Sequence, residues 1–493
     1  MRRARCVGLL LLAGASAARA QTPPGGDATV DSAQVARVAW REGQAALGRG
    51  ELDSAWRAVS RASHAWPEQP VYARGMAVLA ARRRDTTALL QALSRLAAME
   101  AADHPLDSAI ATMARGLTVR RALTELRMAA APRRWSEVWA TSPDTMVFAE
   151  GIDADPKTGR AFVASVRRRT VFVVAPGTEV RDLGLHHSAE VSAVLGVRFD
   201  PRRRTLWVTT SGLPYAEGYQ AGDSVVAGLL RVDPESGEIL ARYDAPGLEP
   251  RVLGDLAVGP RGDVLVTDSR QPVVLRLRPG RDSLEGFRHP LFRSLQGVAF
   301  SPRDEAIVYL ADWSHGLLRW DTRRGEVERL PAPAGITSLG LDGIVMRGDA
   351  IIGIQNGVAP PRVVRLDLDR AGRRIVSIQV IDRNLPLADE PTIATLLGDR
   401  LLYVANSQWN KYQEDGTRRP GTSLGPTVLL SLPLGSAAGP PSRPEVRNGW
   451  ESLTRTGTAY TEVPAHGPPT GGVQIDAPGP GVPPGATECA TWR

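Results

Sequence analysis

The sequence predicts a mainly β protein, a six-bladed β-propeller that follows a small all-α region. Three observations lead to this fold class. A frame of three short apolar strands recurs six times, successive copies start 42 to 59 residues apart, and an Ala-rich stretch with helical periodicity precedes them. Strand-only repeats of roughly 40 to 50 residues are typical of propeller blades.

The clearest copy of the frame lies at residues 294–321. Its three strands are predicted at 297–300, 306–311 and 316–320. Runs rich in Val, Ile, Tyr and Trp favour strands, and the Pro, Gly, Asp and Ser residues between them favour tight turns. Because the runs are more continuously apolar than alternating, we expect sheets that are buried on both faces.

The other copies repeat the same order of strands and turns. Their first strands begin near residues 151, 196, 255, 343 and 391, so the propeller is predicted to occupy residues 135–435. The sixth copy has only three convincing strands, and a lone strand is predicted at Trp135–Ala140, before the first copy. We expect the lone strand to pair as the outermost strand of the sixth blade, because this closes the ring and removes an exposed edge.

The first twenty residues are predicted to be a secretory signal peptide rather than part of the fold. Three arginines within the first five residues precede an apolar stretch, and small residues permit cleavage near Ala20-Gln21. The sequence therefore predicts a secreted or periplasmic protein. No later window offers about 18 continuous apolar residues, so we expect no membrane span.

The next segments are predicted to be a Pro/Gly linker at residues 21–30 and a helical region at residues 31–130. Small residues at helix contacts let antiparallel helices approach closely, and a closing Pro ends the second helix. These positions, which resemble the tetratricopeptide pattern, are Gly43, Ala55, Ala62 and Pro67. Two interpretations are open for the region, a plain cap on the propeller or an adaptor that binds a protein partner.

The composition argues against a nucleic-acid partner. Removing the predicted signal peptide leaves 56 basic and 53 acidic residues, so the formal net charge falls from +7 to +3. Arginine clusters such as residues 202–204 fall at predicted turns, where solvated side chains are the ordinary interpretation. Cys489 is then the remaining cysteine, which leaves no internal disulfide. It lies in the Pro/Gly-rich residues 436–493, predicted to be a disordered tail.

Polar side chains are expected to converge at one mouth of the central channel, where inner strands begin and where second strands turn into third strands. The strand starts supply Glu150, Asp255, Gln296, Asp342 and Glu390, and the turns supply Asp268, Asp312, His315, Asn356, Asn406 and Trp409. Carboxylate and amide oxygens are the ligands that hard divalent cations prefer. We therefore predict a small-molecule ligand at the mouth and a divalent metal, Ca²⁺ first, with Zn²⁺, Mg²⁺ and Mn²⁺ as alternatives.

Two long turns are predicted to overhang the same mouth. They span residues 210–227 and 406–426, and they carry Tyr215, Tyr219, Trp409 and Tyr412. Loops supply many binding residues, and aromatic rings offer large surfaces for stacking. The sequence therefore predicts an aromatic lid.

The frames Glu150-Gly151-Ile152, Gln296-Gly297-Val298 and Asp342-Gly343-Ile344 resemble those of the family of gluconolactonases, senescence-marker protein and related lactonases. The resemblance covers about residues 147–434. It implies a six-bladed propeller with one divalent metal in the channel and a metal-dependent lactone or ester hydrolase. It also implies that Glu150, Gln296 and Asp342 are the metal ligands and that Asp342 is the general base.

The sequence departs from the family pattern at two positions. Gln296 stands where the family has Asn, and Gly254 stands where the family has a substrate-side Asn. Similar frames occur in propellers of the NHL and strictosidine-synthase-like types, which share the fold without a common activity. The alternative hypothesis is a non-catalytic propeller that binds a ligand or protein at its mouth, with Glu150 and Asp342 bonding only to turn backbones.

Overall fold

The computed structural model describes residues 27–102, 107–175, 180–220, 226–247 and 249–435. The predicted signal peptide, its cleavage site and the predicted C-terminal tail lie outside these residues.

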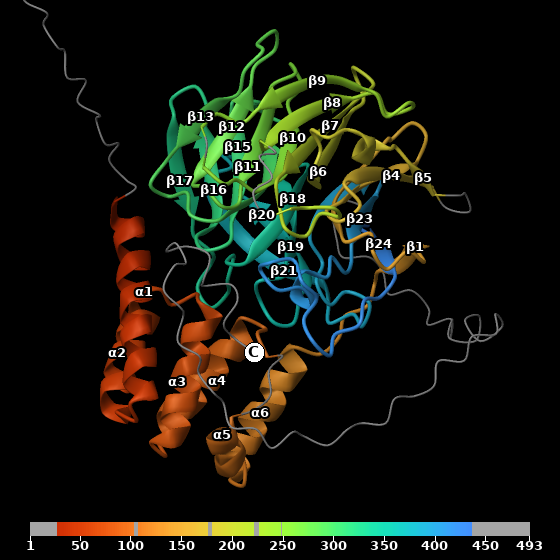
Figure 1. Ribbon diagram of the computed structural model, residues 1–493. Helices are drawn as coiled ribbons and strands as arrows, with labels where there is room; N and C mark the ends of the chain where they lie inside the picture. The colour runs from red at the N-terminus through yellow and green to blue at the C-terminus, as the bar shows by residue number, and fades with distance from the viewer. Residues whose placement is uncertain (1–26, 103–106, 176–179, 221–225, 248, 436–493) are drawn as a thin grey trace, which may run out of the picture.

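Six antiparallel four-stranded sheets are arranged in a ring, which confirms the predicted six-bladed propeller (Figure 1). The innermost strands contact one another around the ring. The first blade contains β2 (Ala149–Ala154), β3 (Ala161–Ser165), β4 (Thr170–Val174) and β5 (Arg181–Asp182). The second contains β6 (Ala193–Asp200), β7 (Thr205–Ser211), β8 (Gly228–Val232) and β9 (Ile239–Asp244). The third contains β10 (Leu253–Val258), β11 (Val264–Asp268), β12 (Val273–Leu277) and β13 (Glu285–Arg288). The fourth contains β14 (Leu295–Phe300), β15 (Ile307–Asp312), β16 (Gly316–Asp321) and β17 (Glu326–Leu330). The fifth contains β18 (Leu341–Arg347), β19 (Ala350–Gln355), β20 (Arg362–Leu368) and β21 (Ile375–Arg383).

The sixth blade joins the two ends of the propeller and confirms the predicted closure. It consists of β22 (Ala394–Leu397), β23 (Arg400–Val404), β24 (Thr427–Pro433) and β1 (Glu137–Ser142). Strand β1 pairs with β24 in antiparallel register. It begins two residues later than predicted, because the backbone N–H groups of Trp135 and Ser136 donate to the Asp382 carboxylate instead, at 3.4 and 2.9 Å.

Glycine is required in the frames because neighbouring inner strands approach closely. A Cβ at Gly151 would lie 2.3 Å from the Leu195 carbonyl oxygen, and one at Gly297 would lie 2.5 Å from the Asp342 carbonyl oxygen. No side chain fits at such distances, since contacts below 3.0 Å force the backbone to move. The glycines of the repeated frames therefore serve the closure of the ring.

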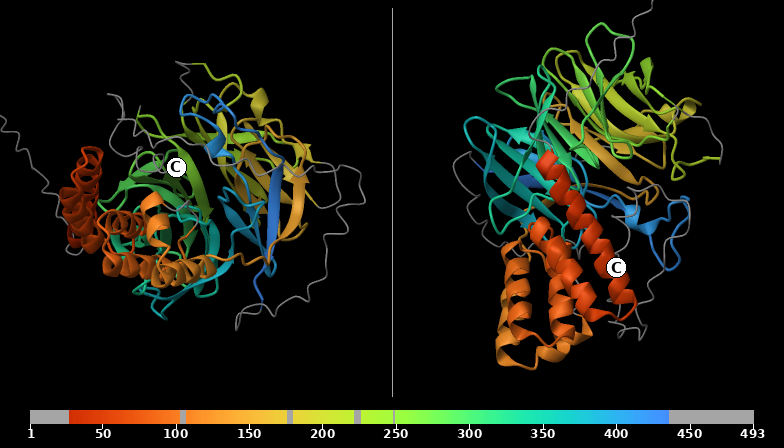
Figure 2. Two further views of the ribbon diagram at one scale, coloured as in Figure 1. Left: turned by 90° about the horizontal axis from the view of Figure 1, so that it is seen from below. Right: turned by 90° about the vertical axis from the view of Figure 1, so that its left-hand side faces the viewer.

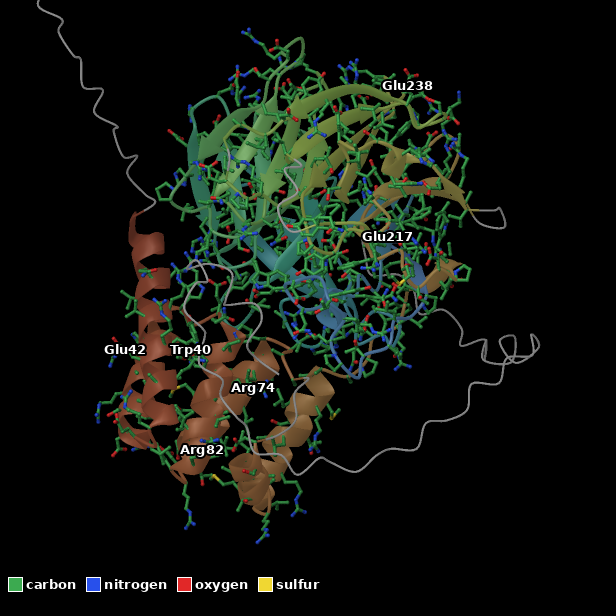
Figure 3. All side chains as sticks on the ribbon, in the orientation of Figure 1. Trp40, Glu42, Arg74, Arg82, Glu217 and Glu238 are labelled. Carbon is green, nitrogen blue, oxygen red and sulfur yellow. The ribbon has the colours of Figure 1, made fainter. Side chains whose placement is uncertain are left out.

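The N-terminal region consists of helices, as predicted. They are α1 (Asp27–Gly48), α2 (Leu52–Ala65), α3 (Pro70–Arg82), α4 (Thr86–Ala98), α5 (Ser108–Met113) and α6 (Leu117–Ala129). Helices α1 and α2 form the expected close hairpin, where a Cβ at Gly43 would lie 2.6 Å from the Val59 side chain. The side chain of Trp40 is labelled in Figure 3, and its ring centroid lies 5.2 Å from that of Tyr72 in α3. None of the helices in the described ranges is long and apolar enough to cross a membrane.

Helix α1 corrects the predicted linker at residues 21–30. The helix begins at Asp27, so residues 27–30 are helical rather than extended. The physical reason is local, because Gly26 is the last helix-breaking residue before the Ala-rich sequence begins.

The helical region packs against the fourth and fifth blades, next to the strands drawn in green and teal (Figure 2). The Arg329 guanidinium lies 4.4 Å from the Trp66 ring centroid, and Trp66 contacts the His315 ring at 6.1 Å. Leu339 of the propeller is buried in a cluster with alanines of α1. His315 and Leu339 lie in turns and Arg329 lies near the end of β17, so the helices cover part of one mouth of the propeller.

The arginine cluster at residues 202–204 connects neighbouring blades. Arg202 donates to the Pro260 carbonyl oxygen at 2.7 Å, and Arg204 donates to the Asp155 carboxylate at 2.9 Å. Exposed contacts of this kind contribute little individually. The cluster lies in a turn, as the sequence predicts, and its side chains contact the turns of the adjoining blades.

Candidate functional site

Three carboxyl groups lie near the inner-strand starts and interact electrostatically. Glu150 and Asp342 are buried, and Glu390 is half-buried. Glu150 lies in β2, Asp342 in β18, and Glu390 in the segment that leads to β22, which begins at Ala394. Asp342 raises the pKa of both glutamates, and none of the ion pairs in the described part of the chain includes any of the three groups. The structure therefore gathers negative charge here without a basic partner in contact.

Glu150 is held by an aromatic side chain from a distant loop. The indole N–H of Trp409 donates to Oε2 of Glu150 at 2.7 Å. Burial raises the pKa of Glu150 well above its usual range, and the charge on Asp342 adds to this effect. The Trp409 hydrogen bond opposes the shift because it stabilises the ionised carboxylate.

Asp342, the predicted base, is held by Asn356. The Asn356 side-chain Nδ2 donates to Oδ2 of Asp342 at 2.6 Å and to the Pro391 carbonyl oxygen at 2.8 Å. Burial raises the pKa of Asp342 to about 7. The other amide atom of Asn356, Oδ1, is buried without a hydrogen-bond partner in the described chain.

Glu390 was recognised in the sequence as an inner-strand start. Its Oε2 accepts a hydrogen bond from the Asn410 backbone N–H at 3.0 Å. Burial raises the pKa of Glu390 to about 7, with further contributions from Asp389 and Asp342. Its pKa near neutrality and its interaction with Asp342 make Glu390 a candidate site residue.

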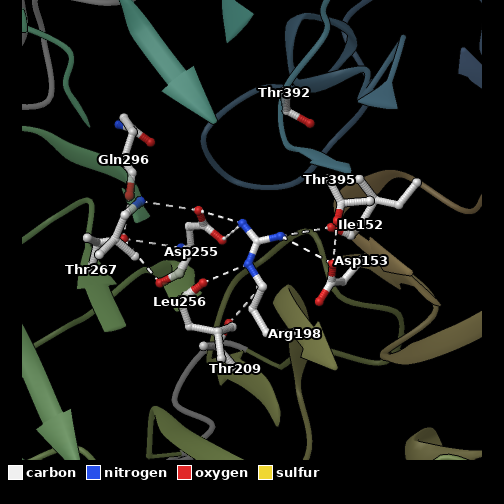
Figure 4. A network of polar contacts seen from close by, with 12 residues as sticks. Ile152, Asp153, Arg198, Thr209, Asp255, Leu256, Thr267, Gln296, Thr392 and Thr395 are labelled. Carbon is white, nitrogen blue, oxygen red and sulfur yellow. Dashed lines mark hydrogen bonds and ion pairs between the residues drawn. The ribbon is translucent and has the colours of Figure 1, made fainter. Parts of the chain in front are cut away.

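Asp255, predicted at the mouth, is paired with a buried arginine (Figure 4). Arg198 donates to both carboxylate oxygens of Asp255 at 3.1 and 3.2 Å, and also to the Leu256 and Ile152 carbonyl oxygens. Burial raises the pKa of Asp255, and Arg198 opposes that rise. This fully hydrogen-bonded pair joins three blades and fills the interior beside the carboxyl groups.

Gln296, the third predicted ligand, makes two long hydrogen bonds to serine hydroxyl groups. Its Oε1 accepts from the Ser269 hydroxyl at 3.3 Å, and its Nε2 donates to the Ser294 hydroxyl at 3.4 Å. Its side chain points away from the Arg198 guanidinium (Figure 4). Its role as a ligand stays a prediction.

Three of the predicted mouth residues bond to backbone groups of their own turns, and the two aspartates also bond to the segment that leads into the inner strand. Asp312 accepts from the backbone N–H groups of residues 293, 294, 314 and 315. Asp268 accepts from three backbone N–H groups and from Arg251 at 3.0 Å. Asn406 links the Pro426 carbonyl oxygen with the Val428 backbone N–H. Such bonds organise the turns.

His315 lies at the contact with the helical region. Its Nδ1 is 2.7 Å from the Leu291 carbonyl oxygen, and its Nε2 is 3.5 Å from the Arg37 guanidinium of α1. Burial lowers the pKa of His315. The structure thus places this predicted mouth residue beneath α1.

The predicted aromatic lid is a packed cluster. Trp409 and Tyr412 from one loop and Tyr215 from the other contact Phe148, with ring centroids 4.6, 5.1 and 5.9 Å from its own. The loops also meet through their backbones at Gly416 and Pro214. The rings stack on one another, and Phe148, which immediately precedes the first blade, fills the centre of the cluster.

The sequence reasoning missed Arg198. Arg198 could have been found in the sequence, because it is a charged residue inside the apolar run that forms β6. A charge buried in such a strand requires a partner. The segment Gly421-Thr422-Ser423-Leu424-Gly425 also matches the Gly-x-Ser-x-Gly pattern. It lies in the loop before β24, without the preceding strand and following helix of a nucleophile elbow, and Ser423 is exposed.

Whether a divalent cation fits this site depends on which oxygen atoms are present and on whether they already have hydrogen-bond partners. Within the described residues, no three His, Cys, Asp or Glu side chains gather closely enough to hold a metal ion. Glu150 and Asp342 nevertheless repel each other, and Asn356 Oδ1 is an unpaired oxygen beside them. Two carboxylates with neutral amide oxygens form a donor set that suits a hard cation.

The sequence matches no protein-family model and no curated protein. The fold is similar to those of several solved structures at low identity. A gluconolactonase from Xanthomonas campestris is 16% identical with a TM-score of 0.38, and the match covers 60% of this chain and 86% of that one. Regucalcin from Agrobacterium tumefaciens, named a calcium-binding protein, is 17% identical with a TM-score of 0.41, over 60% and 93%. Virginiamycin B lyase from Staphylococcus aureus is 12% identical with a TM-score of 0.40, over 54% and 81%.

Proposed function

We propose that the propeller is a divalent-metal-dependent hydrolase of lactones or other esters, with its site at the carboxyl groups of the channel. One observation carries the proposal: Asp342 interacts electrostatically with both Glu150 and Glu390, and no basic side chain forms an ion pair with any of the three in the described residues. Buried charges of one sign are costly unless they bind a counter-ion or a proton. Such clusters are typical of sites that do chemistry.

The residues divide into two roles. Glu150 and Asp342 would hold the cation, together with the neutral amide oxygens of Asn356 and Gln296. A divalent cation bound there would polarise the substrate carbonyl and stabilise the developing negative charge. Asp342 would also act as the general base for water through its carboxylate. Its pKa of about 7 belongs to the carboxyl group without a cation, and the charge of a bound cation would lower it.

The surroundings of the carboxyl groups support a small substrate. The Arg198–Asp255 pair fills the interior on one side, and the aromatic cluster around Phe148 covers Glu150 through Trp409. These contacts limit the entry of water, which strengthens electrostatic interactions inside the site.

The test is hydrolysis of uncharged lactones and of p-nitrophenyl acetate after chelation and re-addition of Ca²⁺, Mg²⁺, Mn²⁺ or Zn²⁺. We expect activity that depends on the cation, and a loss of about 10²- to 10⁴-fold in kcat/KM for Asp342→Asn. Asp244→Asn is the matched control, because Asp244 lies in the outer strand β9 and pairs with Arg242 at 2.6 Å, away from the carboxyl groups. Activity that survives in Asp342→Asn at the level of the control would contradict the assignment.

A second candidate function is non-catalytic binding at the mouth, with the helices as an adaptor. It is favoured by the lack of a pre-assembled three-residue metal cluster in the described chain and by the helices that cover part of the mouth. Wild-type protein that takes up no cation and hydrolyses none of these substrates would support this function.

A further inference from the structure

The turn at residues 356–361 contacts both the carboxyl site and the helical region. At its start, Asn356 donates to Asp342 at 2.6 Å. Three residues later, the Ala359 carbonyl oxygen accepts from the backbone N–H of Ala102 at 3.0 Å. Val358, between them, is buried in the hydrophobic core of the helical region. A single short turn therefore connects the two parts of the molecule.

Arg362, directly after this turn, makes a second connection. It is 2% exposed, and its guanidinium donates to the Met99 carbonyl oxygen at the end of α4 at 2.7 Å. Its Nε donates to Oε1 of Gln355 at 2.6 Å, directly before the turn. A buried arginine whose Nε and Nη1 groups both donate hydrogen bonds fixes the residues that it joins, because an unpaired charge there is costly.

Gln355 extends the connection to a second part of the helical contact. Its Nε2 donates to the carbonyl oxygens of Thr337 and Leu339, at 3.0 and 2.7 Å. Leu339 packs with the alanines of α1. Hydrogen bonds therefore connect the residues on both sides of the turn, Gln355 and Arg362, with the contact between propeller and helices.

We propose that the helical region is a positioning element of the carboxyl site, which fixes the 356–361 turn and thereby the amide of Asn356 against Asp342. The inference rests on the proposed function for its effect on cation binding. It assigns the helices a role beyond that of a cap or an independent adaptor. Arg362 is a positioning residue that acts through Gln355 and the turn.

The test compares two arginines that join the propeller to the helices. Arg362→Met removes the link at the turn. Arg329→Met is the matched control, because Arg329 is also buried and joins Trp66 and Glu68 to the fourth blade without contacting the turn. Backbone hydrogen exchange of peptides covering residues 355–361 and Ca²⁺ affinity by calorimetry are measured for both.

We expect Arg362→Met to speed exchange in the turn by about tenfold and to weaken Ca²⁺ binding by a similar factor, which corresponds to a local loss near 1.4 kcal/mol. Arg329→Met should change neither. In the Asn356→Ala background, Arg362→Met should weaken Ca²⁺ binding no further, because both substitutions act on one contact. Should Arg362→Met not fold, Arg362→Lys retains the charge and is expected to show the same pattern at a smaller amplitude.

Equal effects of the Arg362 and Arg329 substitutions on exchange and on Ca²⁺ affinity would overturn the inference. They would show that any loosening of the helices from the propeller has the same result. Unchanged exchange in the turn of Arg362→Met would overturn it as well. If wild-type protein binds no cation and hydrolyses nothing, the proposed function fails, whereas the exchange comparison still decides whether the helices fix the turn.

Discussion

Asp312 and Asp342 are both buried aspartates of neighbouring blades, yet their surroundings are opposite. Asp312 ends a second strand and accepts four backbone N–H groups. Asp342 lies in an inner strand, where its one side-chain hydrogen bond comes from Asn356 and where burial raises its pKa to about 7. In this pair, the number of backbone N–H groups that each carboxylate accepts distinguishes the turn-forming aspartate from the candidate catalytic one.

The largest expected effect on stability comes from removing the Asp312 carboxylate. Asp312→Ala leaves four backbone N–H groups without their acceptor and should lower the free energy of unfolding by about 3 kcal/mol. Asp342→Asn should leave it unchanged or raise it, because it removes a buried charge near other carboxylates. Urea unfolding at pH 7 measures both, and a similar loss in the two variants would refute the distinction.

The pH dependence of stability sharpens the same comparison. Folded Asp342 and Glu390 have pKa values of about 7, whereas unfolded Asp and Glu titrate near pH 4. Between these values the folded state binds more protons, so the free energy of unfolding falls as pH rises from about 4 to 7. The melting temperature without divalent cations should therefore be lower at pH 8 than at pH 5.5.

The matched control for this prediction is the double variant Asp342→Asn, Glu390→Gln. It should reduce the pH dependence. Glu150, whose pKa burial raises well above its usual range, and Asp382, whose pKa burial raises to about 6, retain part of it. A Ca²⁺ excess at pH 8 should raise the melting temperature of the wild type alone. Parallel pH curves for the two proteins would show that the channel carboxyls do not carry the effect.

The fold could be predicted from the sequence because closing the ring imposes local rules. The frame glycines are fixed by the approach of adjacent inner strands, as at Gly151 and Gly297, and the turn residues recur with each blade. These rules hold for any propeller of this size, so the same frames that predict the fold say little about activity.

The site could be predicted only in part, because the sequence does not show what each polar group bonds to. Glu150 and Asp342 do interact in the channel, whereas Asp268, Asp312 and His315 bond to turns or to the helical contact. The Trp409–Glu150 bond joins residues 259 positions apart. The partner that distinguishes one carboxylate from another lies on a different blade or loop, beyond the reach of a repeat pattern.

The smallest expected effect concerns Gln296, the predicted ligand whose oxygen accepts from Ser269 at 3.3 Å. Gln296→Ala should weaken Ca²⁺ binding by about three- to tenfold, because a neutral amide oxygen contributes about as much as one ordinary hydrogen bond. Gln296→Asn, which keeps the amide on a shorter side chain, should lose less, and Ser269→Ala serves as a control that frees the oxygen without removing it. Calorimetry on the three variants measures the ranking. Equal affinity in wild type and Gln296→Ala would leave Gln296 as a partner of Ser269 alone and reduce the ligand set to Glu150, Asp342 and Asn356.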